Sequence, residues 1–364
     1  MAATERKRVL GVSSDVVRGI NRRLAMNLIR TRQPLSRDGL ARHSGLQRST
    51  VSLIIEDLIS ENWVLEGPTE RLPRGRHPTF LRLNDDRVIL SADLHPSRII
   101  AALQRIIAAS EGKKIEGIGI ALPGRYDVDT NRVVFTPNLK WPEFELIAPI
   151  AQATGYEVVM APATNACVLA AAWFDNKDSV RDMVVITVSE GIGAGLFMNG
   201  QLVRGYRDMA GEFGHVPIDV NGPLCGCGSH GCWEVFASNA AALRYFAEAR
   251  PDAPAASFPA LLDLADAGDE QAMQALDKMA HFLARGMRVI VAGIAPQRIV
   301  VIGDLTRSWE RFGPVLEAQV KGQVLRGGIA PQVAPAHEDG LARLRGTVAL
   351  VLQRHFGSSM ETPA

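Results

Sequence analysis

Three of the four cysteines in the chain stand within eight residues of one another, and this spacing constrains the fold more than any other feature of the sequence. They are Cys225, Cys227 and Cys232, and His215 precedes the first of them by ten residues. Cysteines this close together make a poor disulfide framework. Three thiolates and one imidazole are a typical ligand set for tetrahedral zinc, at roughly 2.0 to 2.3 Å from the metal. Since four protein ligands leave no open coordination position, we predict structural zinc, with unligated cysteines or a regulatory disulfide as the alternatives.

The composition is that of a soluble, folded protein of more than one domain. Of the 364 residues, 47% are hydrophobic and the formal net charge is +1, which excludes the disordered class. No run of about eighteen apolar residues is present, and the first ten residues contain no apolar signal segment. The sequence therefore predicts a cytoplasmic protein that does not enter a membrane.

The positive charge is concentrated in residues 1–82, here called the N-terminal module. The module contains 15 Lys and Arg against 8 Asp and Glu, a net charge of +7, whereas the remaining residues contain 25 against 31, a net charge of −6. A basic module on a mildly acidic body suggests an anionic partner for the module alone. An ordinary solvated charged surface is the alternative.

The N-terminal module has the pattern of three helices. They cover NRRLAMNLIR, LSRDGLARHSGL and QRSTVSLIIEDLISENWV, with Ser36 as an N-cap and HSGL as the turn before the third helix. Apolar residues at helical spacing in the third helix are expected to be buried: Val51, Ile54, Ile55, Leu58 and Ile59. Polar residues at its N-terminal end are then exposed, and they suit contacts with base edges and phosphates in a major groove. They are Gln47, Arg48, Ser49, Thr50 and Ser52.

A cationic hairpin is predicted after the third helix. In PTERLPRGRHPTFLRL, two short apolar runs flank Arg71, Arg74, Gly75 and Arg76. Arginines on either side of a glycine can enter a narrow minor groove, where the electrostatic potential is negative. An ordinary solvated loop is the alternative for the hairpin by itself. Together with the helices and the charge, the hairpin predicts a winged helix-turn-helix domain that binds double-stranded DNA.

Residues 83–364 alternate strand and helix patterns, which is typical of α/β layers. The strand patterns are RVILSADL, SRIIAAL, KIEGIGIALPG, RDMVVITV, GAGLFMNGQLV and QRIVVIGD. The helix patterns are NACVLAAAWF, DEQAMQALDKMAHFLARGMRVIVAGI and LARLRGTVALVLQRHF.

Several motifs of residues 83–364 are familiar in their order. They are GIGIALPG, TPNLKW, TNACVLAAAW, GIGAGLFMNGQLVRG, AGEFGHV, CGCGSHGCWE and VVIGD. In these motifs the body resembles the ROK family of repressors and sugar kinases, and with the module before it the chain is similar to the family's repressors of xylose or N-acetylglucosamine genes. The resemblance implies an actin-like fold of two α/β lobes around a cleft. Family members have a further strand and much of a helix after the equivalent of Leu103, so either the first lobe is shorter here or the sequence has a gap at this point.

The resemblance also implies roles for individual residues of the body. The zinc ligands would be His215, Cys225, Cys227 and Cys232, in a loop that spans residues 211–234. Carboxylates accept charge-assisted hydrogen bonds from hydroxyls, which suits a sugar-type effector. The effector residues would be Gly124, Asn138, Glu212, His215 and Glu234, with capping or loop hydrogen bonds as the alternative role of the glutamates.

The positions at which a family kinase transfers phosphate differ in this chain. Ala163 stands where the kinases have the aspartate that deprotonates the sugar hydroxyl, and Pro162 replaces the preceding asparagine. The phosphate-binding elements are also changed, at His95, Pro96, Glu190 and Asp304. We therefore predict that the protein is not an enzyme.

The sequence as a whole predicts a DNA-binding transcriptional regulator, in particular a repressor of carbohydrate-related genes. It would bind operator DNA as a homodimer or homotetramer and sense a sugar-type effector with a zinc-stapled, non-catalytic body. One alternative is an ATP-dependent sugar kinase fused to a DNA-binding module. Another is a body that only dimerises or docks a second protein.

Overall fold

Contacts along the chain divide it into two compact units. In this computed structural model the described residues are 14–69, 79–93, 99–136, 141–175, 180–322, 324, 328–336 and 341–356. Unit 1 comprises Met1–Ile89, Ile107–Glu116 and Val351–Ala364, and unit 2 comprises Leu90–Ile106 and Gly117–Leu350. The boundary at residue 82 stays a prediction, because unit 1 also takes in short segments from later in the chain.

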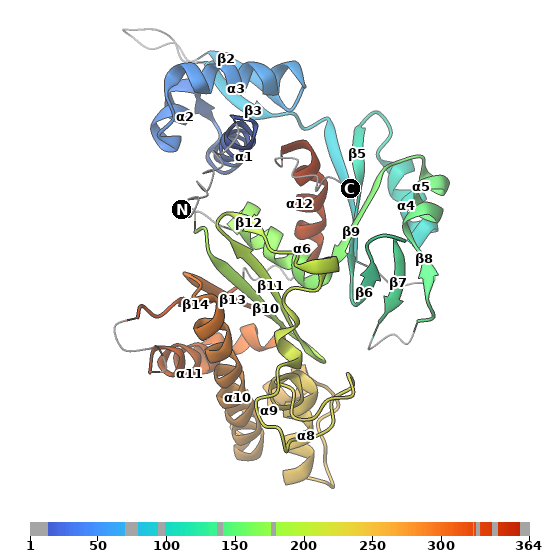
Figure 1. Ribbon diagram of the computed structural model, residues 1–364, viewed down its shortest axis with the longest axis vertical. Coiled ribbons are helices and arrows are strands. Elements are labelled where there is room, and N and C mark those ends of the chain that lie inside the picture. Colours follow the sequence, from blue (N-terminus) through green and yellow to red (C-terminus); the bar gives the residue numbers. More distant parts are fainter. Residues whose placement is uncertain are drawn as a thin grey trace, which may run out of the picture. The chain divides into compact units, whose positions relative to one another are not determined.

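Unit 1 contains the three predicted helices and a small antiparallel sheet (Figure 1). The helices are α1 (Ser14–Arg32), α2 (Arg37–Ser44) and α3 (Arg48–Ser60). The strands are β1 (Leu35–Ser36), β2 (Val64–Thr69) and β3 (Thr79–Leu83), in the order β1-β3-β2. Ser36 caps α2, since its hydroxyl accepts from the Gly39 amide at 3.1 Å, and the left-handed Gly45 ends that helix. Both local predictions are confirmed.

The stripe of α3 faces the core of this unit. Val51, Ile54, Ile55 and Leu58 are buried, as predicted, and Ile59 is only half-buried. Ile29 of α1, Leu40 of α2 and Leu81 of β3 are fully buried in the same unit. Burying an aliphatic side chain of this size contributes about 1.5 to 3 kcal/mol, so apolar burial is the main source of stability for the helices.

A buried ion pair lies beside an aromatic cluster in unit 1. Arg87 and Glu116 are 2.7 Å apart with side chains only 7% and 5% exposed, and the Arg87 guanidinium stands 3.5 Å from the centroid of Trp63. Burial opposes ionisation of Glu116, but Arg87 and Lys114 together outweigh burial and hold the pKa of that carboxyl below its usual value. His355 and Phe356, at the end of α12 (Ala342–Phe356), pack edge-on against Trp63 with ring centroids 4.9 and 4.7 Å away. The last turn of the C-terminal helix thus belongs to the core of unit 1.

Unit 2 is built around a five-stranded sheet in the order β12-β11-β10-β13-β14. Its central strand is β10, which runs antiparallel to β11 and parallel to β13. A parallel pair of buried strands reads as a nearly continuous apolar run, and MVVITV and RIVVI have this composition. The five strands are β10 (Met183–Val188), β11 (Ile192–Met198), β12 (Gln201–Leu202), β13 (Arg298–Ile302) and β14 (Gln332–Pro335).

Two smaller sheets complete the strands. One has the order β4-β5-β9, with β5 and β9 parallel, and the other has the order β6-β7-β8. Their strands are β4 (Arg87–Asp93), β5 (Lys114–Leu122), β9 (Val158–Pro162), β6 (Arg125–Asp127), β7 (Arg132–Phe135) and β8 (Phe144–Glu145). Strand patterns predicted in RVILSADL, KIEGIGIALPG, RDMVVITV, GAGLFMNGQLV and QRIVVIGD are confirmed.

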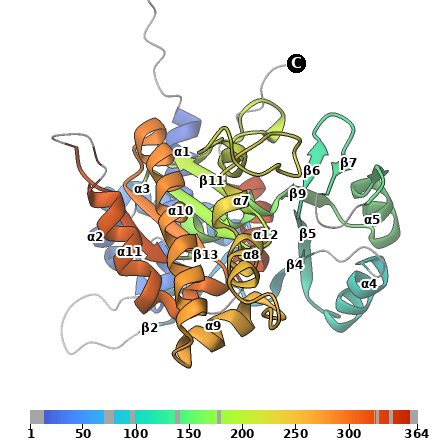
Figure 2. The ribbon, with the colours of Figure 1, turned by 90° about the horizontal axis from the view of Figure 1, so that it is seen from below.

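The long helix α10 (Glu270–Ile294) packs against helices α8 (Asn239–Ala249), α9 (Phe258–Asp266) and α11 (Trp309–Gly322), as Figure 2 shows. Helix α6 (Ala163–Ala170) lies against β10 and β11 and continues into a π-helical turn. Among the described residues, the other α-helices with residues in this unit are α4 (Ile99–Ala109), α5 (Ile147–Thr154), the short α7 (Glu234–Ala237) and the first part of α12. None of the described helices is both long and apolar enough to cross a membrane.

The prediction of a strand in SRIIAAL is wrong. Ile99–Ala109 forms helix α4, with Ile99, Leu103 and Ile107 recurring at helical spacing. The apolar run continues into QRIIAA. The combined segment is long enough for a helix and is rich in the helix formers Ala, Leu, Gln and Arg. Leu103 is fully buried, so this helix still contributes to the core.

Candidate functional site

The cysteine loop, residues 211–234, contains little regular structure. After the short 3₁₀ turn η4 (Glu212–His215), single bridges join Pro217 to Cys232 and Leu224 to His230. The amide of Trp233 donates to the Val216 carbonyl at 2.9 Å, and the amide of Cys225 donates to the Ser229 carbonyl at 2.8 Å. These hydrogen bonds bring the residues after His215 next to Cys232 and Trp233, and they close a second turn around residues 225–229.

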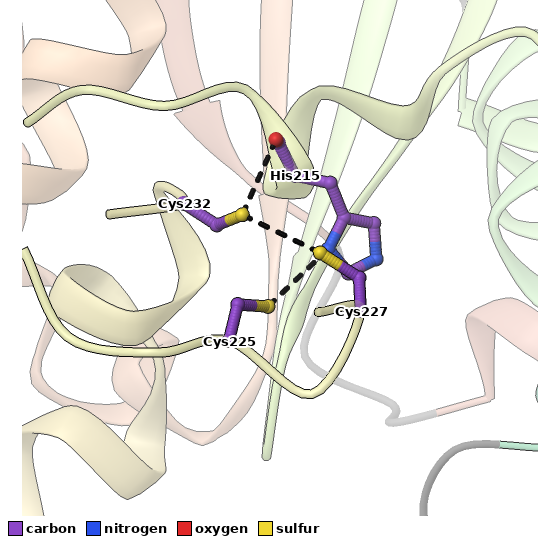
Figure 3. Close-up of side chains that lie close together, drawn as sticks. All are labelled: His215, Cys225, Cys227 and Cys232. Atoms are coloured by element: carbon purple, nitrogen blue, oxygen red, sulfur yellow. Dashed lines mark hydrogen bonds between the residues drawn. The ribbon is translucent and has the colours of Figure 1, made fainter. Parts of the chain in front are cut away.

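The four predicted metal ligands converge within this loop (Figure 3). Cys225 Sγ lies 3.6 Å from His215 Nδ1, and Cys227 Sγ lies 3.6 Å from Cys232 Sγ. All four ligand atoms are within 4.8 Å of one another. Ligands about 2.3 Å from a tetrahedral zinc ion stand roughly 3.8 Å apart, so the donor set and its spacing fit zinc. A bound ion would cross-link the loop and would have no open position for substrate.

The thiols differ in acidity. Burial raises the pKa of Cys225 and Cys232, whereas a hydrogen bond from the Ser229 backbone amide lowers the pKa of Cys227 to about 7. Because the thiolate is the form that binds metal, Cys227 is prepared for ligation at neutral pH. Cys227 is also the exposed member of the group, while Cys225 and Cys232 are buried.

Trp233 anchors the cysteine loop to helix α10. Its indole is 1% exposed, and Nε1 donates to the Phe282 carbonyl at 2.9 Å. Gly286 allows this contact, because a Cβ at that position would lie 1.9 Å from the indole ring. The predicted metal ligand Cys232 is adjacent to this anchor, so the end of the loop is fixed against helix α10.

Three of the predicted effector residues lie in or beside the predicted ligand group: His215 belongs to it, and Glu212 and Glu234 lie next to His215. Glu212 Oε2 is 3.8 Å from His215 Nε2, and Glu234 Oε1 is 3.5 Å from His215 Nδ1. Glu234 also accepts from the Cys225 thiol at 2.9 Å and from the Ile192 amide at 3.4 Å. The loop therefore gathers Glu212, His215 and Glu234, and the Glu234 carboxylate already links Cys225 of the predicted ligand group to the start of β11.

The other two predicted effector residues are not part of this group. Gly124 follows β5, where a Cβ would lie 2.2 Å from the Phe135 carbonyl oxygen, so close backbone packing alone requires a glycine there. Asn138 lies outside the described residues.

The ROK family model matches residues 82–354, about three quarters of the chain. The chain belongs to the ROK family. Its α/β unit is accordingly the actin-like kinase-fold domain of that family, as the sequence predicted.

Two curated relatives and two solved structures resemble this ROK chain over most of its length. The xylose repressor of Bacillus spizizenii is 27% identical over 88% of this chain and 90% of its own. The transcriptional dual regulator NagC of Escherichia coli is 23% identical over 86% of this chain and 87% of its own. A ROK family transcriptional regulator described as a homologue of the E. coli MLC protein has a TM-score of 0.71 at 22% identity, covering 93% of this chain and 99% of its own. A ROK glucokinase from Streptomyces griseus has a TM-score of 0.62 at 28% identity, covering 76% and 91%.

The kinase positions of the ROK domain fall at strand and helix ends. Pro162 ends β9 and Ala163 begins α6, where a methyl group stands at the predicted place of a catalytic carboxylate. Glu190 and Asp304 are both exposed and follow the adjacent parallel strands β10 and β13. Two carboxylates thus occupy the same edge of the sheet, which disfavours phosphate there. His95 and Pro96 lie outside the described residues.

The predicted DNA-binding residues of this ROK chain lie at the start of α3. Gln47, Arg48 and Ser49 are exposed, whereas Thr50 and Ser52 are half-buried. Arg48 pairs with Asp38 of α2 at 2.6 Å and remains 82% exposed. Strands β2 and β3 pair antiparallel on either side of the predicted hairpin tip, whose Arg71, Arg74, Gly75 and Arg76 lie outside the described residues.

Two features of the ROK chain escaped the sequence analysis. Tyr126 of β6 donates to Asp208 at 2.6 Å, four residues before Glu212, and burial first and Asp208 second raise the pKa of that phenol. No local pattern joins residues 82 positions apart. Leu53 of α3 is 64% exposed, opposite the buried stripe, and a plot of the helix around its axis would have found it.

Proposed function

We propose that this ROK protein is a DNA-binding transcriptional repressor of carbohydrate-related genes, acting in the cytoplasm as a homodimer or homotetramer. The observation that carries the proposal is that one chain contains both a basic three-helix module with a β-hairpin and a ROK domain. In that domain Ala163 stands at the catalytic position of the kinases. Repressors bind DNA with the first part and respond to an effector with the second.

The geometry of unit 1 supports a winged helix-turn-helix. Helices α2 and α3 are joined by a three-residue turn, and the β2-β3 hairpin follows α3 at once. Helix α3 buries one face and exposes its N-terminal end, which is how a recognition helix enters a major groove. The hairpin carries three arginines, so it is the wing of this domain and contacts the minor groove or phosphates.

The cysteine loop supports a structural zinc ion rather than a catalytic one. His215 and the three cysteines would fill all four coordination positions. In the proposal the ion fixes Glu212, His215 and Glu234 as one wall of an effector site, to which Gly124 and Asn138 contribute from other segments. The effector is a sugar or a sugar derivative, because paired carboxylates suit hydroxyl groups.

DNA binding is tested with full-length protein and a random library of duplexes. The protein should select a sequence with two-fold symmetry and half-sites separated by whole helical turns. Arg48→Ala should weaken binding to that sequence. Its control is Arg307→Ala, which breaks a comparable exposed ion pair with Asp263 in the body and should leave binding unchanged. Failure to enrich any duplex would overturn the proposal.

The hairpin is tested by the salt dependence of binding. Arg74→Ala together with Arg76→Ala should lower affinity and reduce the slope of log affinity against log salt by about 1.8, for two phosphate contacts. An unchanged slope would remove the wing from the interface.

The second candidate function, an ATP-dependent sugar kinase, is favoured by the match to the glucokinase structure. We expect no turnover with ATP and a panel of hexoses and amino sugars, because Ala163 cannot accept the proton of the attacking hydroxyl. Turnover that Glu212→Ala abolishes would establish the kinase instead.

The proposed zinc ion is tested by metal analysis of the purified protein, which should find one zinc ion per chain. Cys167→Ala is the control that should keep the metal, since Cys167 lies in the core away from the four predicted ligands.

A further inference from the structure

Helix α3 has two opposite faces. Val51, Ile54, Ile55 and Leu58 are buried, and the facing positions are Ser49, Ser52, Leu53 and Glu56. These four recur at spacings of three and four residues, so they form one continuous surface about two turns long. Ser49, Leu53 and Glu56 are exposed and Ser52 is half-buried. This surface, here called the outer face of α3, contains one apolar side chain.

Leu53 is unusual because of its place in the outer face. A single exposed leucine is ordinary on a protein surface. Here it is 64% exposed, and it stands at the centre of the helix, between polar residues one turn before and one turn after. A polar side chain in this place would be better solvated, so a partner that offers apolar contact explains the leucine.

The charges around the N-terminal half of α3 favour an anionic partner, whereas the exposed acid of the outer face, Glu56, stands in the C-terminal half. Asp57 pairs with Arg18 of α1, and Glu61 pairs with Arg22 at 2.6 Å, so the acids near the end of α3 are neutralised by the neighbouring helix. Arg48 stands at the start of α3, held by Asp38 and largely exposed. The N-terminal half of the helix is therefore the part suited to approach phosphates, which brings the outer face against base edges.

We propose that Leu53 recognises the 5-methyl group of a thymine in the major groove. This inference rests on the proposed DNA binding. Among the major-groove edges of the four bases, only thymine presents a methyl group, and apolar side chains recognise it by contact. A serine hydroxyl can donate to an acceptor edge or accept from a donor edge, so serines do not discriminate between the two. Leu53 is therefore the residue of the outer face that selects thymine by its methyl group.

The test replaces thymine by deoxyuridine, which removes the methyl group and keeps every hydrogen-bonding atom. Starting from the duplex that the full-length protein selects, each thymine is replaced in turn and the affinity is measured. We expect one thymine in each half-site at which the replacement weakens binding about fourfold, the factor that corresponds to burial of one carbon group. Leu53→Ala should weaken binding to the unmodified duplex by a similar or larger factor and abolish the effect of that replacement.

The control is Ile20→Ala, which removes an exposed apolar side chain of α1 and should keep both the affinity and the sensitivity to deoxyuridine. Leu53 is overturned as the thymine contact if no thymine is sensitive, or if Leu53→Ala retains the same sensitivity as the unaltered protein. A library from which no duplex is enriched overturns the proposed function itself, so the two failures are distinguishable.

Discussion

The cysteine loop and helix α3 present functional side chains in two different ways. In α3, the helical period sets the position of every residue, and the buried apolar residues pack the helix onto the core of unit 1. In the loop, His215 and Cys232 are brought together from 17 positions apart by a few single hydrogen bonds. Regular structure positions α3 by itself, whereas the loop has only these few bonds and the proposed metal ion to hold its ends together.

The two regions also differ in what is buried. Helix α3 buries four large apolar side chains, each of which contributes stability by itself. Within residues 222–230, Cys225 is buried, while Gly222, Leu224 and Cys227 are exposed or half-exposed. Little apolar burial offsets the entropy of ordering this part of the loop, so the proposed metal coordination would be the term that decides its stability.

The largest expected effect is loss of a metal ligand. Structural zinc contributes about 10 to 16 kcal/mol of apparent binding free energy in zinc-finger peptides, so Cys232→Ser should destabilise the ROK domain by at least about 3 kcal/mol. The variant should contain less zinc, and its melting temperature should fall by roughly 6 °C or more.

Chelation of the unaltered protein should lower the melting temperature in the same way, and Cys167→Ala should leave the zinc content unchanged. Equal melting curves with and without a strong chelator would mean that the loop is held without metal. The contrast between the loop and α3 would then disappear.

The next effect concerns the buried stripe of α3. Ile55 is fully buried, so Ile55→Ala should destabilise unit 1 by about 2 to 5 kcal/mol. DNA binding should be lost with the fold of the module, whereas the zinc content should stay at one ion per chain. Leu53→Ala on the outer face is the matched control, and its free energy of unfolding should change by less than about 0.5 kcal/mol. Zinc loss in Ile55→Ala would contradict the independence of the two regions.

A smaller effect is expected where the loop meets α10. Gly286→Ala should destabilise the domain by about 1 to 3 kcal/mol, because the new Cβ forces Trp233 to move. The same change at Gly293, on the same helix with open space around it, should be neutral or stabilising by up to about 1 kcal/mol. Denaturant unfolding of both variants measures the difference. Equal midpoints would show that the Trp233 anchor is not needed.

The smallest effect is a pH dependence in unit 1, which lacks a metal site among its described residues. Burial lowers the pKa of His355 in the folded state, so the unfolded state binds a proton more readily. Unit 1 should therefore lose stability as pH falls through about 6.5 toward the lower folded-state value.

His355→Gln should flatten this pH dependence, and His281→Gln, at an exposed position on α10, should not. The measurement is the denaturation midpoint between pH 5 and 8. Identical pH profiles for His355→Gln and the unaltered protein would exclude His355 as the responsible group.

Much of unit 1 and of the ligand set could be predicted. The buried residues from Val51 to Leu58 and the Ser36 cap follow from patterns within a few residues, and the four predicted metal ligands follow from a spacing of at most 17 residues. The prediction of a strand in SRIIAAL was wrong because a short apolar run suits both a strand and a helix, and the residues after it decide between them.

Contacts between distant segments had no local signal. The packing of Trp233 on Gly286 joins residues 53 positions apart, and the pair Tyr126 and Asp208 joins residues 82 positions apart. The contact of Trp63 with His355 joins an early and a late segment of the chain. Each depends on how whole elements pack, which no period or spacing encodes.

Side-chain chemistry and short-range spacing were enough to predict the class of each region: a basic module with amphipathic helices, an α/β body that resembles the ROK family, and a His-Cys₃ ligand set. Which atoms meet, such as the Glu234 carboxylate with Cys225 and the amide of Ile192, depends on how the folded chain packs. That packing also decided which face of α3 is left outside, with Leu53 on it, because burial depends on what the rest of the unit covers.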